Sequence, residues 1–320
     1  MTHIFSRGFA DALSIALALG FVAGDAVRAA AETPPLVYSD RRTDATVMKR
    51  AGELRDAGSL PASDVLLPQL NNKKCALILP VTHTQKLAGR DLWAAARQSY
   101  LRVGWFYLCS KCSHWHLDLA GGYVITADGV AVTCHHVAET PEKFIKGHFI
   151  AATDDGSVLP VTAILAANAK SDVCIVRLKA DAPLVPLPLS DAARPGDIVY
   201  CFSDPMGFRG YFSQGIVNRY YRELPRRRDA KNGSSVENQP LSLNVSTDWA
   251  PGSSGAAVID ECGNAIGHVA RILPVEEEPR KKKKTAGPDE PASQHEDRGT
   301  LMVMHNAVPA QEVLALIEKK

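Results

Sequence analysis

The sequence predicts an all-β fold, either a sandwich or a barrel, and three observations support this. From Ser99 onward the chain consists of short apolar runs with β-type alternation, separated by turn residues. Long helical patterns are almost absent from this part of the chain. The hydrophobic fraction of 46% and the charged fraction of 22% are those of an ordinary globular protein. Roughly a dozen short strands of this kind favour two packed sheets or a closed barrel.

The expected elements follow one another along the chain. A helix is expected over 45–54, a short apolar strand over 75–81, and a second helix over 91–98 with Asp91 as its N-cap. A last helix is expected over 310–319. The strands between these helices are predicted at 100–108, 123–126, 130–133, 144–151, 163–166, 173–178, 198–202, 213–221, 241–245, 256–259 and 265–272.

Composition also divides the chain into segments. Residues 1–31 have a basic residue, a short apolar run and small residues before Glu32, which predicts a cleaved secretory signal; an uncleaved N-terminal anchor is the alternative. Residues 32–87 are interpreted as an N-terminal extension of unknown role, and 88–320 as the main domain. Within it, 222–240 is expected to be a long hairpin loop. Residues 274–298 carry Glu and Lys runs with too little apolar content to fold, which predicts a disordered insert.

The charge balance narrows the possible partners. The formal net charge is only +1, so nothing indicates a nucleic-acid partner, and no later segment is apolar enough for a stable membrane span after signal cleavage. Export would place the protein in the periplasm or outside the cell, where its seven cysteines could form disulfides. The pairing and the oligomeric state are not predictable from this sequence.

Three fragments carry the residues of a nucleophilic site. A predicted strand ends in Thr133-Cys134-His135-His136, Asp172 lies at the start of an alternating strand, and Gly252-Ser253-Ser254-Gly255 precedes another strand. A serine hydroxyl needs an imidazole to take its proton, and a carboxylate must orient that imidazole. The glycines permit a tight turn in which the backbone N–H groups of Gly252 and Ser254 can stabilise an oxyanion.

These fragments, in the order His, Asp, Ser, resemble those of trypsin-like serine proteases of the chymotrypsin clan. Further segments are similar to the bacterial HtrA/Deg-type branch: Ser203–Phe208 with Ser213–Val217, and Asn306–Pro309 before a helix. The resemblance covers about 90–320 and implies two perpendicular six-stranded antiparallel β-barrels with the catalytic residues in the cleft between them. Because the chain ends soon after the last expected helix, no PDZ domain is expected.

The resemblance assigns roles to the individual residues. It implies Ser254 as nucleophile, His136 rather than His135 as base, and Asp172 rather than the turn residues Asp154 and Asp155 as orienting acid.

It also suggests a substrate-binding strand at Ala270-Arg271-Ile272, in which Arg271 could oppose basic substrates. Asp248 would either select basic side chains or accept backbone N–H groups at the base of a loop. Ser253 stands where trypsins carry an Asp, so a trypsin-style zymogen switch is not implied. Ala256-Ala257, in place of the usual Gly-Pro, is a second departure from the family pattern.

A second cluster of reactive residues, Cys109, Cys112, His114 and His116, lies in Cys109–His116. A haem-attachment site is excluded because Ser113 occupies the position of the required histidine. Because no second C-x-x-C accompanies the motif and the expected compartment is oxidising, a local Cys109–Cys112 disulfide or a pair of thiols is favoured. A zinc site and a redox pair are the alternatives. No cofactor is expected for the main reaction.

The sequence therefore predicts an exported serine endopeptidase that acts on polypeptide substrates through an acyl-enzyme. The alternative is a latent or inactive protease fold that binds peptides, which the substituted Ala256-Ala257 suggests.

Overall fold

The structure is a computed structural model that describes residues 36–224, 235–276 and 300–319. The predicted secretory signal, most of the predicted insert and the centre of the predicted hairpin loop lie outside the described residues. Among the residues described, no helix is long and apolar enough to cross a membrane.

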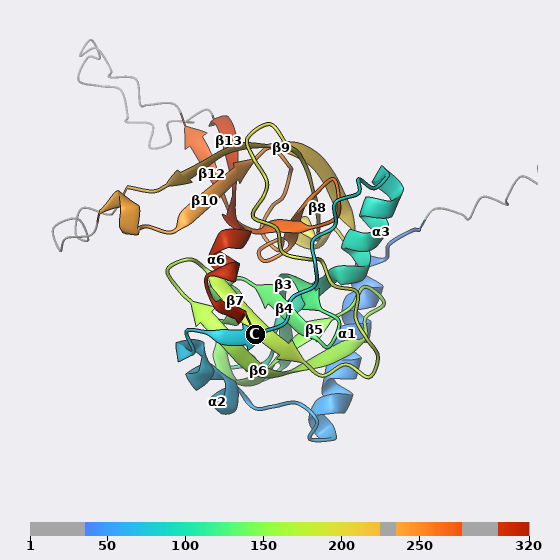
Figure 1. Ribbon diagram of the computed structural model, residues 1–320. Coiled ribbons are helices and arrows are strands. Elements are labelled where there is room, and N and C mark those ends of the chain that lie inside the picture. The colour runs from blue at the N-terminus through green and yellow to red at the C-terminus, as the bar shows by residue number, and fades with distance from the viewer. Residues whose placement is uncertain (1–35, 225–234, 277–299, 320) are drawn as a thin grey trace, which may run out of the picture. The chain divides into compact units, whose positions relative to one another are not determined.

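Two closed six-stranded antiparallel barrels form the core of residues 38–319, which confirms the predicted all-β class and the double barrel that the resemblance implied (Figure 1). The first barrel has the strand order β2-β3-β4-β7-β6-β5 and the second has the order β10-β13-β12-β11-β8-β9. The strands of the first are β2 (Tyr100–Cys109), β3 (Trp115–Thr126), β4 (Val130–Thr133), β5 (Phe144–Ala152), β6 (Val158–Asn168) and β7 (Val173–Leu178). Those of the second are β8 (Ile198–Ser203), β9 (Tyr211–Arg222), β10 (Leu241–Val245), β11 (Ala257–Asp260), β12 (Ala265–Glu276) and β13 (Thr300–Pro309).

The helices are short, apart from two near the N-terminus. They are α1 (Asp40–Asp56), α2 (Ser63–Leu66), α3 (Gly89–Ser99), α4 (His135–Ala138) and α6 (Ala310–Leu314), with 3₁₀ turns η1 (Leu67–Asn71), η2 (Pro205–Gly207) and η3 (Val236–Asn238). α1 contains the predicted helix 45–54 and α3 contains the predicted helix 91–98. The expected cap was wrong, because Asp91 lies in the first turn of α3 and Ala88 occupies the N-cap position without a side-chain hydrogen bond.

The C-terminal helix is shorter than the sequence suggested. α6 ends at Leu314, and the chain then forms strand β14 (Ile317–Lys319), which pairs in parallel with β1 (Cys75–Leu77) of the N-terminal segment. Strand β12 continues to Glu276, so residues 274–276 of the predicted insert belong to a strand.

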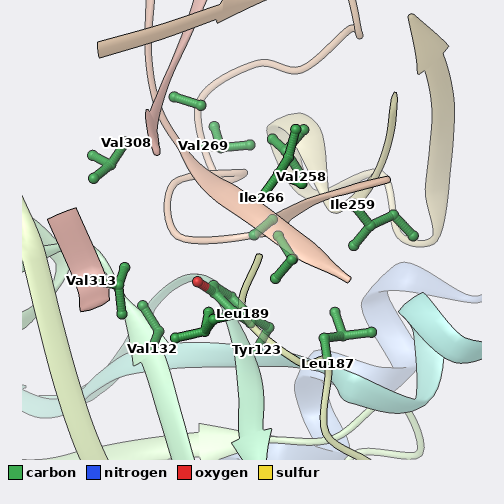
Figure 2. Close-up of a cluster of buried hydrophobic side chains, with 14 of the residues drawn as sticks. Tyr123, Val132, Leu187, Leu189, Val258, Ile259, Ile266, Val269, Val308 and Val313 are labelled. Carbon is green, nitrogen blue, oxygen red and sulfur yellow. The ribbon is translucent and has the colours of Figure 1, made fainter. Parts of the chain in front are cut away.

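A continuous apolar core joins the two barrels. Tyr123 and Val132 of the first barrel are fully buried in the same cluster as Val258 and Ile266 of the second, and Figure 2 shows them facing one another across the interface. Completely burying a side chain of this size contributes roughly 1.5–3 kcal/mol, so the shared core fixes how the barrels are packed together. Residues at their junction are therefore held in a defined geometry.

The N-terminal segment belongs to this packed structure. Val47 and Ala51 of α1 are fully buried against Phe106 and Ile150 of the first barrel. Their spacing of four residues places both on one face of the helix. The segment therefore has a structural role as a cover of the first barrel.

Candidate active site

His136 and Asp172 form a directly bonded pair at the junction of the barrels. His136 lies in α4, immediately after β4, and its Nδ1 atom is 2.8 Å from Oδ2 of Asp172. The backbone N–H of His136 donates to Oδ1 of the same carboxylate at 3.0 Å. Asp172 has a φ of 57°, an uncommon value for a residue other than glycine. The left-handed backbone here precedes β7 and turns the carboxylate toward α4.

The two groups shift each other's pKa. The hydrogen bond to Asp172 raises the pKa of His136 above its ordinary value, against an opposing effect of burial. Burial raises the pKa of the Asp172 carboxyl, but the hydrogen bond and the charge of His136 outweigh it and bring the pKa to about 2. The carboxylate is therefore ionised at neutral pH and favours the protonated imidazole. A histidine with this partner can accept a proton from a nucleophile.

The turn that carries Ser254 packs against β3 and against the end of β4, the strand that precedes His136. The carbonyl of Ser254 accepts the N–H of Gly121 in β3 at 2.7 Å. Gly255 has a φ of 86°, and a Cβ atom there would lie 2.5 Å from Oγ1 of Thr133 at the end of β4. Only glycine allows this approach. Ser254 and His136 thus come from segments in direct contact, although the described residues contain no hydrogen bond between their side chains.

Two backbone N–H groups of this turn have no protein acceptor in the described part of the chain, those of Gly252 and Ser254. The intervening N–H of Ser253 is used within the turn, donating to the carbonyl of Ala250 at 3.1 Å. Gly252 has a φ of 98°, and its loop is held from the opposite side by the N–H of Met206, which donates to the carbonyl of Pro251 at 2.7 Å. Backbone N–H groups that lie beside a serine and have no protein acceptor are suited to bind an oxyanion formed at that serine.

Comparison with known proteins agrees with this geometry. Residues 120–267 match the family model of the trypsin-like peptidase domain. This chain carries a trypsin-like peptidase domain. The matched residues include His136, Asp172 and Ser254.

The curated relatives include several bacterial serine proteases. The chain is 28% identical over 154 residues to the serine protease PepD of Mycobacterium tuberculosis, covering 46% of this chain and 32% of that protein. It is 30% identical over 159 residues to "Probable periplasmic serine endoprotease DegP-like" of Pseudomonas fulva, covering 49% and 29%. A protein of the same name from Ectopseudomonas mendocina is 29% identical over 159 residues, covering 49% and 30%. The chain thus spans about a third of the length of these relatives.

The strand suggested for substrate binding borders the pair of His136 and Asp172. β12 pairs with β11 as far as His268, and Val269 exchanges backbone hydrogen bonds with Gly255 and Ala256. From Ala270 onward no described strand pairs with this edge of β12, while β13 covers the other edge. Ala270 and Arg271 line a cavity of about 200 Å³ together with Asp172. Arg271 is half-exposed and forms an ion pair with Glu223. An extended peptide could add to this open edge as a further strand.

Asp248 is exposed, and among the described residues its carboxylate accepts no hydrogen bond. Its backbone carbonyl is engaged instead, accepting the hydroxyl of Ser213 at 3.0 Å. The next residue, Trp249, is buried and its Nε1 donates to the carbonyl of Arg271 at 3.3 Å. The carboxylate is thus available to a charged group, and the suggested role at the loop base has no contact to support it.

The residues considered as alternatives to His136 and Asp172 make other contacts. Nδ1 of His135 is 3.3 Å from the carboxylate of Glu139. Asp154 accepts hydrogen bonds from Arg97 and Arg209, and Asp155 closes its own turn through Ser157. Neither acid lies beside His136 in the contacts described.

Two buried residues of the site escaped the sequence analysis. Cys134 donates from its thiol to the carbonyl of Val269 at 3.1 Å, and its sulfur lies within 4.8 Å of ligand atoms of both His136 and Asp172. Nε2 of His268, on β12, lies 3.1 Å from the carbonyl of Asp172, and the side chain is fully buried. Burial lowers the pKa of His268, so the neutral ring acts as the donor. Its contact joins positions 96 apart in sequence, which no local pattern could indicate.

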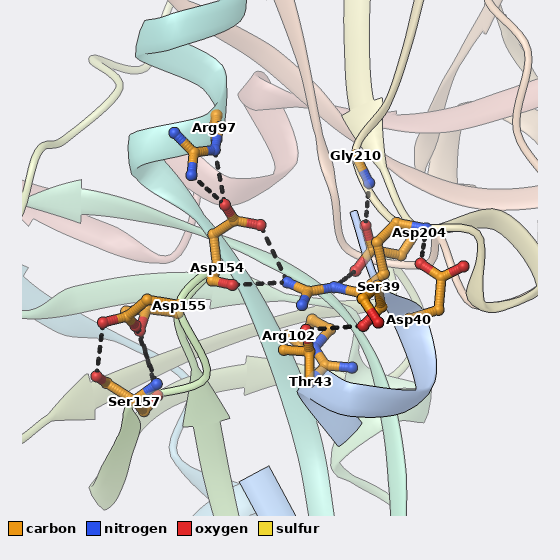
Figure 3. Close-up of polar contacts among 12 residues, drawn as sticks. Ser39, Asp40, Thr43, Arg97, Arg102, Asp154, Asp155, Ser157, Asp204 and Gly210 are labelled. Atoms are coloured by element: carbon orange, nitrogen blue, oxygen red, sulfur yellow. Dashed lines mark hydrogen bonds and ion pairs between the residues drawn. The ribbon is translucent and has the colours of Figure 1, made fainter. Parts of the chain in front are cut away.

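A buried ion-pair cluster supports the loop of Gly252. Arg209, with a side chain only 2% exposed, donates to Asp154 at 3.0 Å and lies 3.6 Å from Asp204. Burial raises the pKa of Asp204, whose backbone carbonyl lies against Gly252. Figure 3 shows Asp154, Asp204 and Arg102 around this cluster. A cavity of about 490 Å³ is lined by Arg209, Gly252 and, at the β2–β3 hairpin, His116.

Proposed function

We propose that this chain is an exported serine endopeptidase in which Ser254 is the nucleophile, His136 the general base and Asp172 the residue that orients the base. The observation that carries the proposal is the bonded pair of His136 and Asp172 beside the glycine turn of Ser254. The periplasmic setting named for two of the relatives supports export.

The proposed reaction follows from which ring nitrogen of His136 is available to accept a proton. Because Nδ1 of His136 faces Asp172, Nε2 is left to take the proton of Ser254. The serine oxygen then bonds to the substrate carbonyl carbon, and the N–H groups of Gly252 and Ser254 hold the oxyanion.

Collapse of this intermediate breaks the C–N bond, and His136 returns its proton to the departing amine. A water molecule next attacks the acyl-enzyme, with its proton passing through His136, and Ser254 is regenerated. The open edge of β12 would hold a polypeptide in the extended form that an endopeptidase requires.

The test is labelling of the purified protein with a fluorophosphonate probe. We expect the wild type to be labelled and Ser254→Ala and His136→Ala to remain unlabelled. Ser253→Ala is the matched control, because it removes the neighbouring hydroxyl, whose residue is fully buried, and should retain labelling. Labelling that survives in Ser254→Ala, or that is lost only in Ser253→Ala, would contradict the assignment.

A second candidate is a latent protease fold that binds peptides. The missing hydrogen bond between Ser254 and His136 favours it, although such bonds often form only with substrate. A folded wild-type protein that stays unlabelled but binds a peptide would support this alternative.

A further inference from the structure

The tip of the β2–β3 hairpin gathers three metal-ligating side chains outside the proposed catalytic site. The sulfur atoms of Cys109 and Cys112 and a ring nitrogen of His116 lie within 4.8 Å of one another. Sγ of Cys112 is 2.9 Å from Nε2 of His116. Both cysteines are free thiols. His114, the fourth residue of the motif, is exposed and lies outside this cluster.

The hairpin holds these side chains in place through its backbone. The N–H of Cys109 donates to the carbonyl of His114 at 2.9 Å, and the N–H of Ser113 donates to the carbonyl of Cys109 at 3.1 Å. Ser113 has a φ of 57°, which reverses the chain between the cysteines and β3. The N–H of Lys111 points to Sγ of Cys109 at 3.4 Å, and such backbone donors favour a thiolate.

Aromatic packing fixes the base of the same hairpin. Trp115 stacks on Phe106 and on His148, with ring centroids 4.6 Å and 5.8 Å apart. Arg55 of α1 covers the Trp115 ring at 4.5 Å. Because Trp115 directly precedes His116, this stack limits the movement of one ligand relative to the cysteines.

From this geometry we propose that the hairpin binds one Zn²⁺ ion through Cys109, Cys112 and His116. Two thiolates and an imidazole are the donors that zinc prefers, and a C-x-x-C turn followed by a histidine is a common arrangement for them. Ligand atoms at zinc–sulfur and zinc–nitrogen distances of about 2.3 and 2.1 Å are about 3.6–3.8 Å apart in a tetrahedron. Small side-chain rotations suffice to reach that spacing from the present one.

Binding leaves the fourth position of the ion to water or another external ligand. Each thiol loses its proton as its zinc–sulfur bond forms, so two protons are released when both cysteines start as thiols, and His116 binds as the neutral ring. His116 also lines the cavity that reaches Gly252. The ion would therefore stiffen one wall of that cavity.

The experiment measures metal bound by the reduced, chelator-treated full chain after addition of Zn²⁺ and desalting. We expect one zinc per chain, and Co²⁺ in its place should give thiolate-to-cobalt charge-transfer absorption. Cys112→Ser and His116→Ala should each weaken zinc binding by at least about 100-fold, the upper range for loss of an outer-sphere partner. Circular dichroism of each variant checks that it is folded.

Two controls separate this site from general thiol or histidine binding. Cys262→Ser removes another partly exposed thiol, and His114→Ala removes the motif histidine outside the cluster; both should keep one zinc per chain. The proposal is overturned if folded wild type binds no zinc, if Cys112→Ser keeps it, or if His114→Ala loses it. Isolation of the protein with a Cys109–Cys112 disulfide and no metal would overturn it as well.

Discussion

Asp172 holds His136 at two points, accepting the ring Nδ1–H at 2.8 Å and the backbone N–H at 3.0 Å. One carboxylate thus fixes both the position of α4 and the rotation of the imidazole that α4 carries. Because His268 also donates to the carbonyl of Asp172, the acid is itself held by the second barrel. The first barrel's histidine is in this way oriented by contacts that span the barrel junction.

The pH dependence of hydrolysis follows from this pair. His136 must be neutral to accept the proton of Ser254, and the bond to Asp172 raises its pKa. We expect kcat/KM to rise with pH along a limb whose midpoint lies above about 6.5, the ordinary value for histidine. The measurement is the pH profile of cleavage of a fluorogenic peptide. A midpoint below the ordinary value would contradict the assignment.

Replacing Asp172 by Asn should affect both rate and pH profile. The amide keeps the shape but loses the charge and favours the wrong tautomer, so we expect kcat to fall by about 10⁴-fold. The midpoint of any remaining acidic limb should move down, because the charge that raised it is gone. Asp155→Asn is the control, since that carboxylate serves only its own turn. Equal activity of the two variants would rule out the proposed role of Asp172.

The same acid contributes to stability in a defined pH range. Its pKa falls from about 3.9 in the unfolded chain to about 2 in the folded protein. The stabilisation is therefore complete above about pH 5 and is lost as pH falls from about 5 toward 2. The Asp172→Asn variant should show a shallower loss of stability than the wild type over that window in urea unfolding. Parallel curves for the two proteins would contradict the lowered pKa.

The sequence predicted the strands well because their pattern is local. Alternation and turn residues indicate β7 and β8 without knowledge of their partners. The strand pairing that closes each barrel, in contrast, came only from the resemblance. The pairing of β1 with β14 was missed, because the paired residues Cys75 and Ile317 are far apart in the sequence and no local pattern indicates their contact. Residues 315–319 also lack a helix breaker, so the end of α6 could not be read from them.

The site was predicted to the extent that it depends on motifs. His136, Asp172 and Ser254 belong to recognisable fragments, and the fold brings those fragments to one junction. Cys134 and His268 are not themselves part of any motif signature, and a cysteine or histidine in an apolar strand is usually predicted to be part of the hydrophobic core. The ion pair of Arg209 with Asp154 was missed for a related reason, because charge patterns do not show which charges will be buried.

Gly121 should be intolerant of substitution despite lying in a regular strand. A Cβ atom there would be 2.6 Å from the backbone nitrogen of Ala256, two residues after Ser254. We expect Gly121→Ala to displace the nucleophile turn, reducing kcat and destabilising the protein by about 1–3 kcal/mol. Gly52→Ala in α1 is the matched control, because nothing lies within 4 Å and alanine favours helix. Unchanged kcat in Gly121→Ala would contradict the close contact.

His268 should act as a positioning residue. His268→Leu removes the donor to the Asp172 carbonyl, which leaves a buried acceptor unpaired at a cost of about 1–3 kcal/mol. We expect a lower kcat with little change in KM, and a shifted acidic limb in the pH profile. His268→Gln retains a donor and should recover part of the activity. A profile unchanged in His268→Leu would show that the residue serves packing alone.

Arg209 should contribute more to stability than an exposed arginine that makes a similar ion pair. Its side chain is 2% exposed and its partner Asp154 is 14% exposed, whereas Arg177 and Asp128 are 30% and 70% exposed. Removing one partner of a buried pair leaves an uncompensated charge and costs about 3–5 kcal/mol, while a surface pair contributes about 0–1 kcal/mol.

We expect Arg209→Met to lower the free energy of unfolding, measured in urea at pH 7, several times more than Arg177→Met does. Asp154→Asn combined with Arg209→Met should cost less than the sum of the two changes, because each single change already breaks the ion pair between these two residues. Arg209 also lies beside the carboxylate of Asp204, whose backbone carbonyl lies against Gly252. Loss of Arg209 should therefore lower kcat as well, and Arg177→Met should not. Equal costs for the two arginines would mean that the cluster at Arg209 is solvated like the surface pair.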